Sequence, residues 1–186
     1  MEQSTFEFAK SYPKKFGGSD LIGKRKSKRP LCTKRPIHLI LKSNLSGVFA
    51  PGNLSLENLI RETAARFNIR IYDLAINWSH IHFIIKIQDQ KDYVGFVRVL
   101  CSVLSDKIRK ARPDSKDVFT LRPFTRILEW GRDLKNVFFY HDKNNMEARG
   151  MYKKKTKSSS ERKLREFTPE FPAPASAKSP AHCPPQ

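Results

Sequence analysis

Residues 80–87, HIHFIIKI, have a hydrophobic residue at every second position, and this pattern determines the predicted fold. Successive side chains of a β-strand point to opposite faces of the sheet. Ile81, Phe83, Ile85 and Ile87 would therefore face a hydrophobic core. The intervening set, His80, His82, Ile84 and Lys86, would face the other way. The stretch predicts a β-strand whose second face carries two imidazole rings.

The segments on either side predict further strands and helices from the spacing of their apolar residues. Ser55 is expected to cap the first helix and Asn68 to end it, whereas Pro113 ends the second helix and Gly150 caps the third. In chain order we predict a strand at 37–42, a helix at 55–68, strands at 69–76 and 80–87, a helix from 93 to 112, a strand at 125–130 and a helix at 133–149.

This order of elements is typical of an α+β protein with a ferredoxin-like split βαβ sandwich. We expect a four-stranded antiparallel sheet with two helices packed on one face, plus a C-terminal helix that bears a tyrosine. The other face of the sheet would stay open. Composition divides the chain into a basic, largely irregular N-terminal arm at 1–35, a folded domain at 36–151, and a tail at 152–186 that is basic and then rich in Pro, Ala and Ser, which predicts disorder.

The charge of the chain indicates its class of partner. Thirty-six Lys and Arg against 18 Asp and Glu give a formal net charge of +18, for which nucleic acid is the default polyanion. An anionic membrane surface is the rival interpretation, but no apolar run approaches the roughly 20 residues of a membrane span. Cys32, Cys101 and Cys183 lie far apart without metal-site spacing, which favours a reduced cytoplasmic compartment.

Two pairs of polar residues suggest a metal-binding and catalytic site. His80 and His82 would stand side by side on one face, a spacing that suits two ligands of one divalent metal ion, although a pair of surface histidines is the alternative. Tyr140 and Asn144 lie four residues apart and share a helical face. Tyr140 is then a candidate nucleophile and Asn144 a candidate third ligand. The alternatives are an ordinary packing tyrosine and a residue near the helix end.

Three segments resemble one family, the single-tyrosine HUH transposases, which include insertion-sequence and REP-associated tyrosine transposases. NWSHIHFIIKI at 77–87 resembles their HUH motif, RDLKNVFFYHDKNNMEARG at 132–150 resembles their tyrosine helix, and RPIHLILKS at 35–43 resembles their first strand. The similarity spans roughly residues 30–151. It implies that His80, His82 and Asn144 bind a metal and that Tyr140 is the catalytic nucleophile. The chain departs from the family at Asn145, where REP-associated members usually have Pro, and at Ser79.

The resemblance also implies a reaction and its partners. A divalent metal, Mg²⁺ or Mn²⁺, would assist the attack of Tyr140 on single-stranded DNA, which leaves a 5′-phosphotyrosine and a free 3′-hydroxyl for strand transfer. The DNA would have hairpin-forming ends, the protein would be bacterial-type, cytoplasmic and nucleoid-associated when bound to DNA, and a homodimer is a possible assembly. The alternative function is a non-catalytic or domesticated nucleic-acid-binding module on the same fold.

Further basic and aromatic residues are weaker candidates for contacts to DNA. Trp78, Trp130 and Phe124 could stack on unpaired bases, with core packing favoured for Phe124. His38 is predicted to be structural and His141 to be solvated. The basic candidates for contacts to the DNA backbone are Lys86, Arg126, Arg132, Lys24, Arg25, Lys28 and Arg29.

Overall fold

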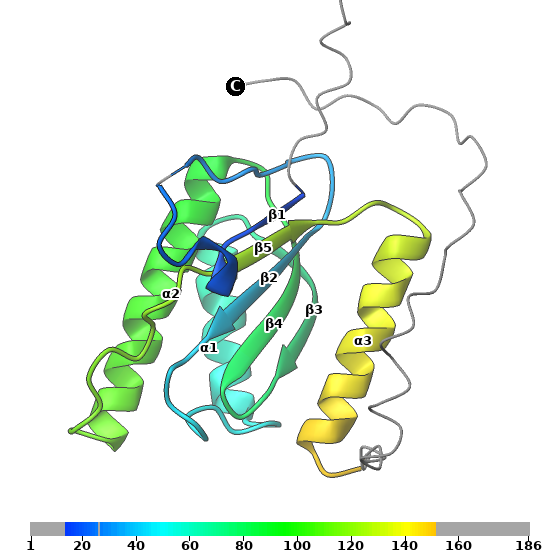
Figure 1. Ribbon diagram of the computed structural model, residues 1–186. Coiled ribbons are helices and arrows are strands. Elements are labelled where there is room, and N and C mark those ends of the chain that lie inside the picture. Colours follow the sequence, from blue (N-terminus) through cyan, green and yellow to red (C-terminus); the bar gives the residue numbers. More distant parts are fainter. Residues whose placement is uncertain (1–13, 26, 152–186) are drawn as a thin grey trace, which may run out of the picture.

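The computed structural model describes residues 14–25 and 27–151, drawn in colour in Figure 1. The predicted tail at 152–186 lies outside the described residues. The elements are β1 (Lys15–Phe16), η2 (Gly18–Leu21), β2 (Ile37–Lys42), α1 (Leu54–Arg66), β3 (Arg70–Ile76), β4 (His80–Lys86), α2 (Gln90–Ala111), β5 (Phe124–Ile127) and α3 (Arg132–Ala148).

One antiparallel sheet holds the domain together, with the strand order β1-β5-β2-β4-β3. The four predicted strands are all present, and the α+β class with its antiparallel sheet is confirmed. The sheet has a fifth strand, β1, because Lys15 and Phe16 pair with Arg126 and Thr125 of β5. This strand lies inside the stretch 1–35, where the sequence predicts irregular structure.

Strand β4 contributes to two separate hydrophobic layers. Ile81, Phe83 and Ile85 are completely buried in the main core, together with Ile60 of α1 and Phe96 of α2. This outcome confirms the predicted alternation, which rests on the twofold period of strands. Figure 1 shows α1 and α2 together, with α3 apart from them.

The second layer lies on the opposite face of the sheet, under α3. Ile84 of β4 packs there against Leu128 and Val137, and Leu134 and Phe138 extend the layer. The prediction of an open face is therefore wrong for this part of the sheet. The apolar stripe of α3 has to be buried, and the exposed apolar surface of the sheet offers the partner.

Two helix ends show how local chemistry sets the boundaries. α1 starts earlier than predicted because the side chain of Asn53, rather than that of Ser55, accepts a hydrogen bond from the backbone N–H of Leu56 at 3.2 Å. At the end of α3, Gly150 has a φ of +73° and donates to the carbonyl of Glu147, and Met151 donates to Met146. This is the capping pattern for which glycine is suited.

The entry into α3 places the next functional residues. β5 ends at Ile127, earlier than the predicted 130, and the side chain of Asp133 accepts a hydrogen bond from the backbone N–H of Glu129 at 3.1 Å. The chain therefore turns away from the sheet before Trp130, which is 54% exposed. Across the described residues, no helix has both the length and the apolar character that a membrane crossing needs.

Candidate metal centre and nucleophile

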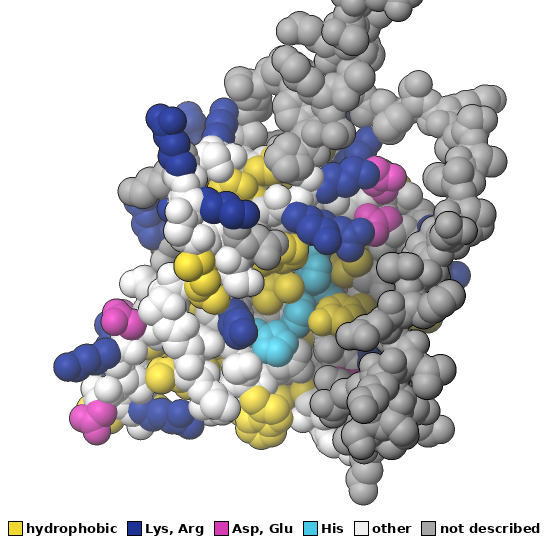
Figure 2. Space-filling model, in the orientation of Figure 1, with side chains coloured by type: hydrophobic (Ala, Val, Ile, Leu, Met, Phe, Trp, Pro, Cys, Tyr) yellow, Lys and Arg dark blue, Asp and Glu magenta, His cyan; other side chains and the backbone are white. Residues whose placement is uncertain are grey.

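The four histidines that the structure describes gather on the face of the sheet that α3 partly covers. His38 lies on β2, His80 and His82 lie on β4, and His141 lies on α3. Figure 2 shows histidine side chains in a continuous strip on this surface, with hydrophobic and basic side chains around it. The pairing of β2 with β4 explains part of the arrangement, since it aligns His82 with Ile40 and His80 with Lys42.

Three of these imidazoles form a compact inner cluster. Nε2 of His38 lies 3.2 Å from Nδ1 of His82, and the two rings stack with centroids 5.5 Å apart. The His141 ring lies 5.1 Å from the His38 ring and 5.4 Å from the His82 ring. One ring nitrogen from each of the three lies within 4.8 Å of the others. The cluster therefore has the residue types and spacing of a site that could hold a metal ion.

The sequence-based prediction that His141 is solvated is wrong. Its side chain is completely buried, and Nδ1 lies 2.7 Å from a carboxylate oxygen of Asp73 on β3. The prediction of a solvated ring fails because His141 follows the buried Val137 by four residues and so shares its inward face. That spacing is a signal the sequence contains. Asp73, by contrast, has no sequence signal that connects it with α3.

Burial controls the protonation of the inner cluster. Desolvation, followed by the neighbouring His141 and Arg126, lowers the pKa of His38 to about 3. Desolvation, followed by His38, His80 and His141, lowers the pKa of His82 to about 2. Both rings are therefore neutral at physiological pH, which is the form that binds metals. His38, predicted to be structural, is thus part of the site.

His80 lies at the outer edge of the strip. Its ring centroid is 4.7 Å from that of His82, but its nitrogens contact the β3–β4 turn, at 3.1 Å from Asn77 Nδ2 and 3.1 Å from Ser79 Oγ. Burial and, secondarily, Lys42 lower its pKa. Lys42 is a residue that the sequence prediction missed, although the alternation of residues 37–42 places it on the face of His38.

The two predicted residues of α3 occupy different environments. Tyr140 is 49% exposed, and its ring centroid lies 5.6 Å from that of His82. Asn144 lies one turn later, and its Nδ2 is buried without a hydrogen-bond partner. The structure thus brings an accessible phenol next to the second histidine of the HIH sequence, and it places an unsatisfied amide on the same helix.

The weaker DNA-binding candidates are distributed over several surfaces. Lys86 places Nζ 6.0 Å from the Trp130 ring centroid, and Trp130 contacts Tyr72 edge-on at 6.4 Å. Arg126 pairs with Asp133. Besides Trp130, the exposed candidates are Lys24, Arg25, Lys28, Arg132 and Trp78.

Arg29 and Phe124 have structural contacts. Arg29 donates to Thr125 Oγ1 at 2.7 Å, and its guanidinium lies 4.6 Å from the Phe16 ring centroid. Since Thr125 is paired with Leu39 of the main core, Arg29 lies on the helix side of the sheet, away from the histidines. Phe124 is half-buried and meets the His38 ring edge-on at 6.5 Å.

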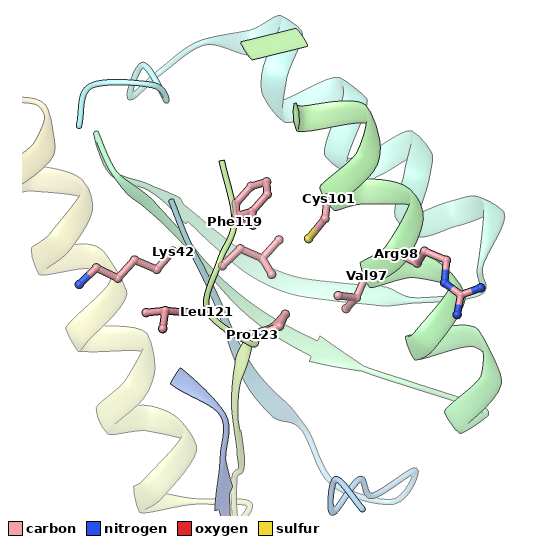
Figure 3. Close-up of a pocket in the computed structure, with 8 residues that line it drawn as sticks. Lys42, Val97, Arg98, Cys101, Phe119, Leu121 and Pro123 are labelled. Atoms are coloured by element: carbon pink, nitrogen blue, oxygen red, sulfur yellow. The ribbon is translucent and has the colours of Figure 1, made fainter. Parts of the chain in front are cut away.

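A pocket of about 190 Å³ lies elsewhere, between α2 and the segment that leads into β5 (Figure 3). Its walls are mainly apolar, and the thiol of Cys101 has its pKa raised to about 11 by burial. The lining residues are Leu41, Lys42, Val97, Arg98, Cys101, Phe119, Leu121 and Pro123. None of them is a histidine, but Lys42 is also the cross-strand neighbour of His80.

Comparison with known proteins identifies the class. Residues 37–124 match the model of a family described as "Transposase IS200 like". The resemblance predicted from the motifs is thereby confirmed. The matched part contains His38, His80 and His82 and ends before α3 with Tyr140 and Asn144. No curated protein matches the chain.

Two solved structures are similar in fold. One is a REP-associated tyrosine transposase bound to a REP hairpin, with 12% identity and a TM-score of 0.51, covering 78% of this chain and 88% of that one. The other is a structure from Deinococcus radiodurans assigned as a transposase, with 14% identity, 65% and 98% coverage and a TM-score of 0.41. At these identities the first shows a shared fold, and the second is too distant to add to it.

Proposed function

We propose that this protein is a transposase that cleaves single-stranded DNA and transfers the cut strand through a covalent bond to Tyr140. The observation that carries the proposal is the exposed phenol of Tyr140 beside His82, with ring centroids 5.6 Å apart. The match of residues 37–124 to the model of the IS200-like transposases supports the same function.

The residues around Tyr140 fit a divalent metal ion. Nε2 of His82 and Nδ2 of Asn144 are buried without hydrogen-bond partners, and a buried polar atom of this kind calls for a ligand. The oxygen and nitrogen of an amide exchange places by a flip, so Asn144 can present its oxygen. We propose that His80, His82 and Asn144 hold Mg²⁺ or Mn²⁺. When bound, such an ion offsets the negative charge that develops on the scissile phosphate.

Tyr140 would perform the chemical step. Its phenolic oxygen attacks the phosphorus, the phenol loses its proton, and the bond from phosphorus to the 3′-oxygen breaks. The products are a 5′-phosphotyrosine and a 3′-hydroxyl that has taken up a proton. A 3′-hydroxyl of another strand then reverses the reaction, so the phosphodiester bond is conserved and no ATP is required.

Basic and aromatic side chains near the histidines would bind the DNA. Lys42 is the cross-strand neighbour of His80, and Lys86 lies on the same face of β4. Cations at these positions can contact phosphates, and Trp130 can stack on an unpaired base. The similar REP-associated transposase is bound to a hairpin, and we propose that this protein also acts on DNA with hairpin-forming ends.

The test is covalent capture of DNA. Purified protein is incubated with Mg²⁺ or Mn²⁺ and 5′- or 3′-labelled single-stranded oligonucleotides that contain hairpins, and the products are separated under denaturing conditions. We expect a protein–DNA adduct that carries the label on the 3′ side of the cut and disappears in Tyr140→Phe. Tyr72→Phe is the matched control, because Tyr72 packs against Trp130 and has no proposed part in the chemistry.

Two results would contradict the proposal. An adduct that persists in Tyr140→Phe would place the nucleophile elsewhere. Salt-sensitive DNA binding with no adduct in either metal, for hairpin and unstructured oligonucleotides alike, would favour the alternative of a non-catalytic nucleic-acid-binding module.

A further inference from the structure

We propose that His38, His82 and His141 form a site for a transition-metal ion such as Zn²⁺, with Asp73 as the carboxylate that orients His141. This set differs from the outer set proposed above, which consists of His80, His82 and Asn144. The inner site does not depend on cleavage of DNA. It is defined by side chains of β2, β4 and α3 that the fold brings together.

The spacing of the ring nitrogens carries the first part of the argument. Two nitrogens bound to one tetrahedral ion, with bonds of about 2.0–2.1 Å, lie roughly 3.3 Å apart. Nε2 of His38 and Nδ1 of His82 are 3.2 Å apart. The ligand atoms of all three histidines lie within 4.8 Å of one another, so a small rotation of the His141 ring would complete the set.

The environment of His141 carries the second part. A histidine that binds a metal through one nitrogen usually donates its other N–H to a carboxylate, which fixes the tautomer and the ring orientation. Nδ1 of His141 is 2.7 Å from Asp73, and Nε2 is buried without a hydrogen-bond partner. The Asp73 bond therefore leaves the lone pair of Nε2 free, and a metal ion would satisfy it.

The ligand type determines the class of ion. Three imidazoles suit borderline ions such as Zn²⁺ and Co²⁺, whereas Mg²⁺ and Ca²⁺ require mainly oxygen ligands. The cluster is almost closed to solvent, with exposed fractions of 7% for His38, 2% for His82 and 0% for His141.

Titration with Co²⁺ tests the site directly. The full-length protein is freed of metal with a chelator, the chelator is removed, and Co²⁺ is added while the visible d–d absorption is recorded. Zn²⁺ is then added to displace it. We expect a saturable band of one Co²⁺ per chain. His38→Gln and His141→Asn should each weaken binding by about 100-fold or more, because each change removes one ligand nitrogen but keeps a group that can hydrogen-bond.

Two further kinds of variant separate the inner site from the outer set. Asp73→Asn should weaken Co²⁺ binding by about 10- to 100-fold, as expected for a residue that orients a ligand. His80→Asn and Asn144→Ala change only the outer set and should weaken Co²⁺ binding less than His38→Gln does. Tyr72→Phe, which belongs to neither set, should leave Co²⁺ binding within about threefold. Circular dichroism checks that each variant is folded, and if His141→Asn does not fold, His38→Gln and Asp73→Asn carry the test.

The inner site is overturned if the wild type gives no d–d band, or if His38→Gln and Asp73→Asn bind Co²⁺ like the wild type. It is also overturned if His80→Asn or Asn144→Ala abolishes binding while the inner variants retain it. That last result would leave the proposed DNA cleavage intact. Conversely, Co²⁺ binding by the inner set together with absence of any DNA adduct would contradict the proposed function alone.

Discussion

Acidification of the metal-free protein should destabilise it through the buried imidazoles of His38 and His82. The pKa of His38 is lowered to about 3 and that of His82 to about 2, against an ordinary value of 6.5 in the unfolded chain. Below pH 6.5 the unfolded chain therefore takes up protons that the folded protein excludes. The free energy of unfolding is therefore unaffected by these two groups above pH 6.5 and decreases as the pH falls below 6.5.

The size of the effect follows from proton linkage. Between pH 7.5 and pH 5.0, protonation of one unfolded histidine with a pKa of 6.5 lowers the free energy of unfolding by about 2 kcal/mol if the folded form stays neutral. His38 and His82 together give about 4 kcal/mol, which is a large share of the roughly 5–15 kcal/mol that stabilises a typical domain. With a urea m-value of about 2 kcal/mol/M, the midpoint should fall by about 2 M.

Urea unfolding monitored by circular dichroism at several pH values, in the presence of a chelator, measures this loss. His38→Gln is the matched variant, since glutamine can donate or accept a hydrogen bond near His82 Nδ1 and cannot titrate. Its loss between the two pH values should be about half that of the wild type. The reasoning is refuted if the wild type loses less than about 1 kcal/mol, or if His38→Gln shows the same pH dependence as the wild type.

Three further predictions concern the fold and the DNA surface. Gly95→Ala places a Cβ 2.5 Å from the Phe67 ring, and this clash should outweigh the better helix propensity of alanine. The net cost should be about 1 kcal/mol, which lowers Tm by about 2–4 °C in a thermal melt. A raised Tm would contradict the clash. Asn53→Ala removes the cap on the Leu56 N–H and should cost about 1 kcal/mol in urea unfolding, and an unchanged midpoint would show that water replaces it. Trp130→Ala should weaken binding of single-stranded oligonucleotides by about 5- to 100-fold in fluorescence anisotropy, because the exposed ring can stack on a base; unchanged affinity would exclude this role.

Much of the candidate site could be predicted from local patterns. The alternation in residues 80–87 determined that His80 and His82 share a face and that Ile81, Phe83 and Ile85 are buried, because a strand has a twofold period. The four-residue spacing predicted that Tyr140 and Asn144 share a helical face, and the excess of basic residues indicated nucleic acid as the partner.

Other features depended on packing between distant segments. His38, Asp73 and His141 come together because the last helix, α3, packs on the sheet. The same packing buries Ile84 under α3. The pairing of β1 with β5 likewise joins segments that lie far apart in the sequence. The period of a helix or strand determines which of its own residues share a face. It does not determine which other element covers that face, because that choice depends on burial of apolar surface summed over the whole domain.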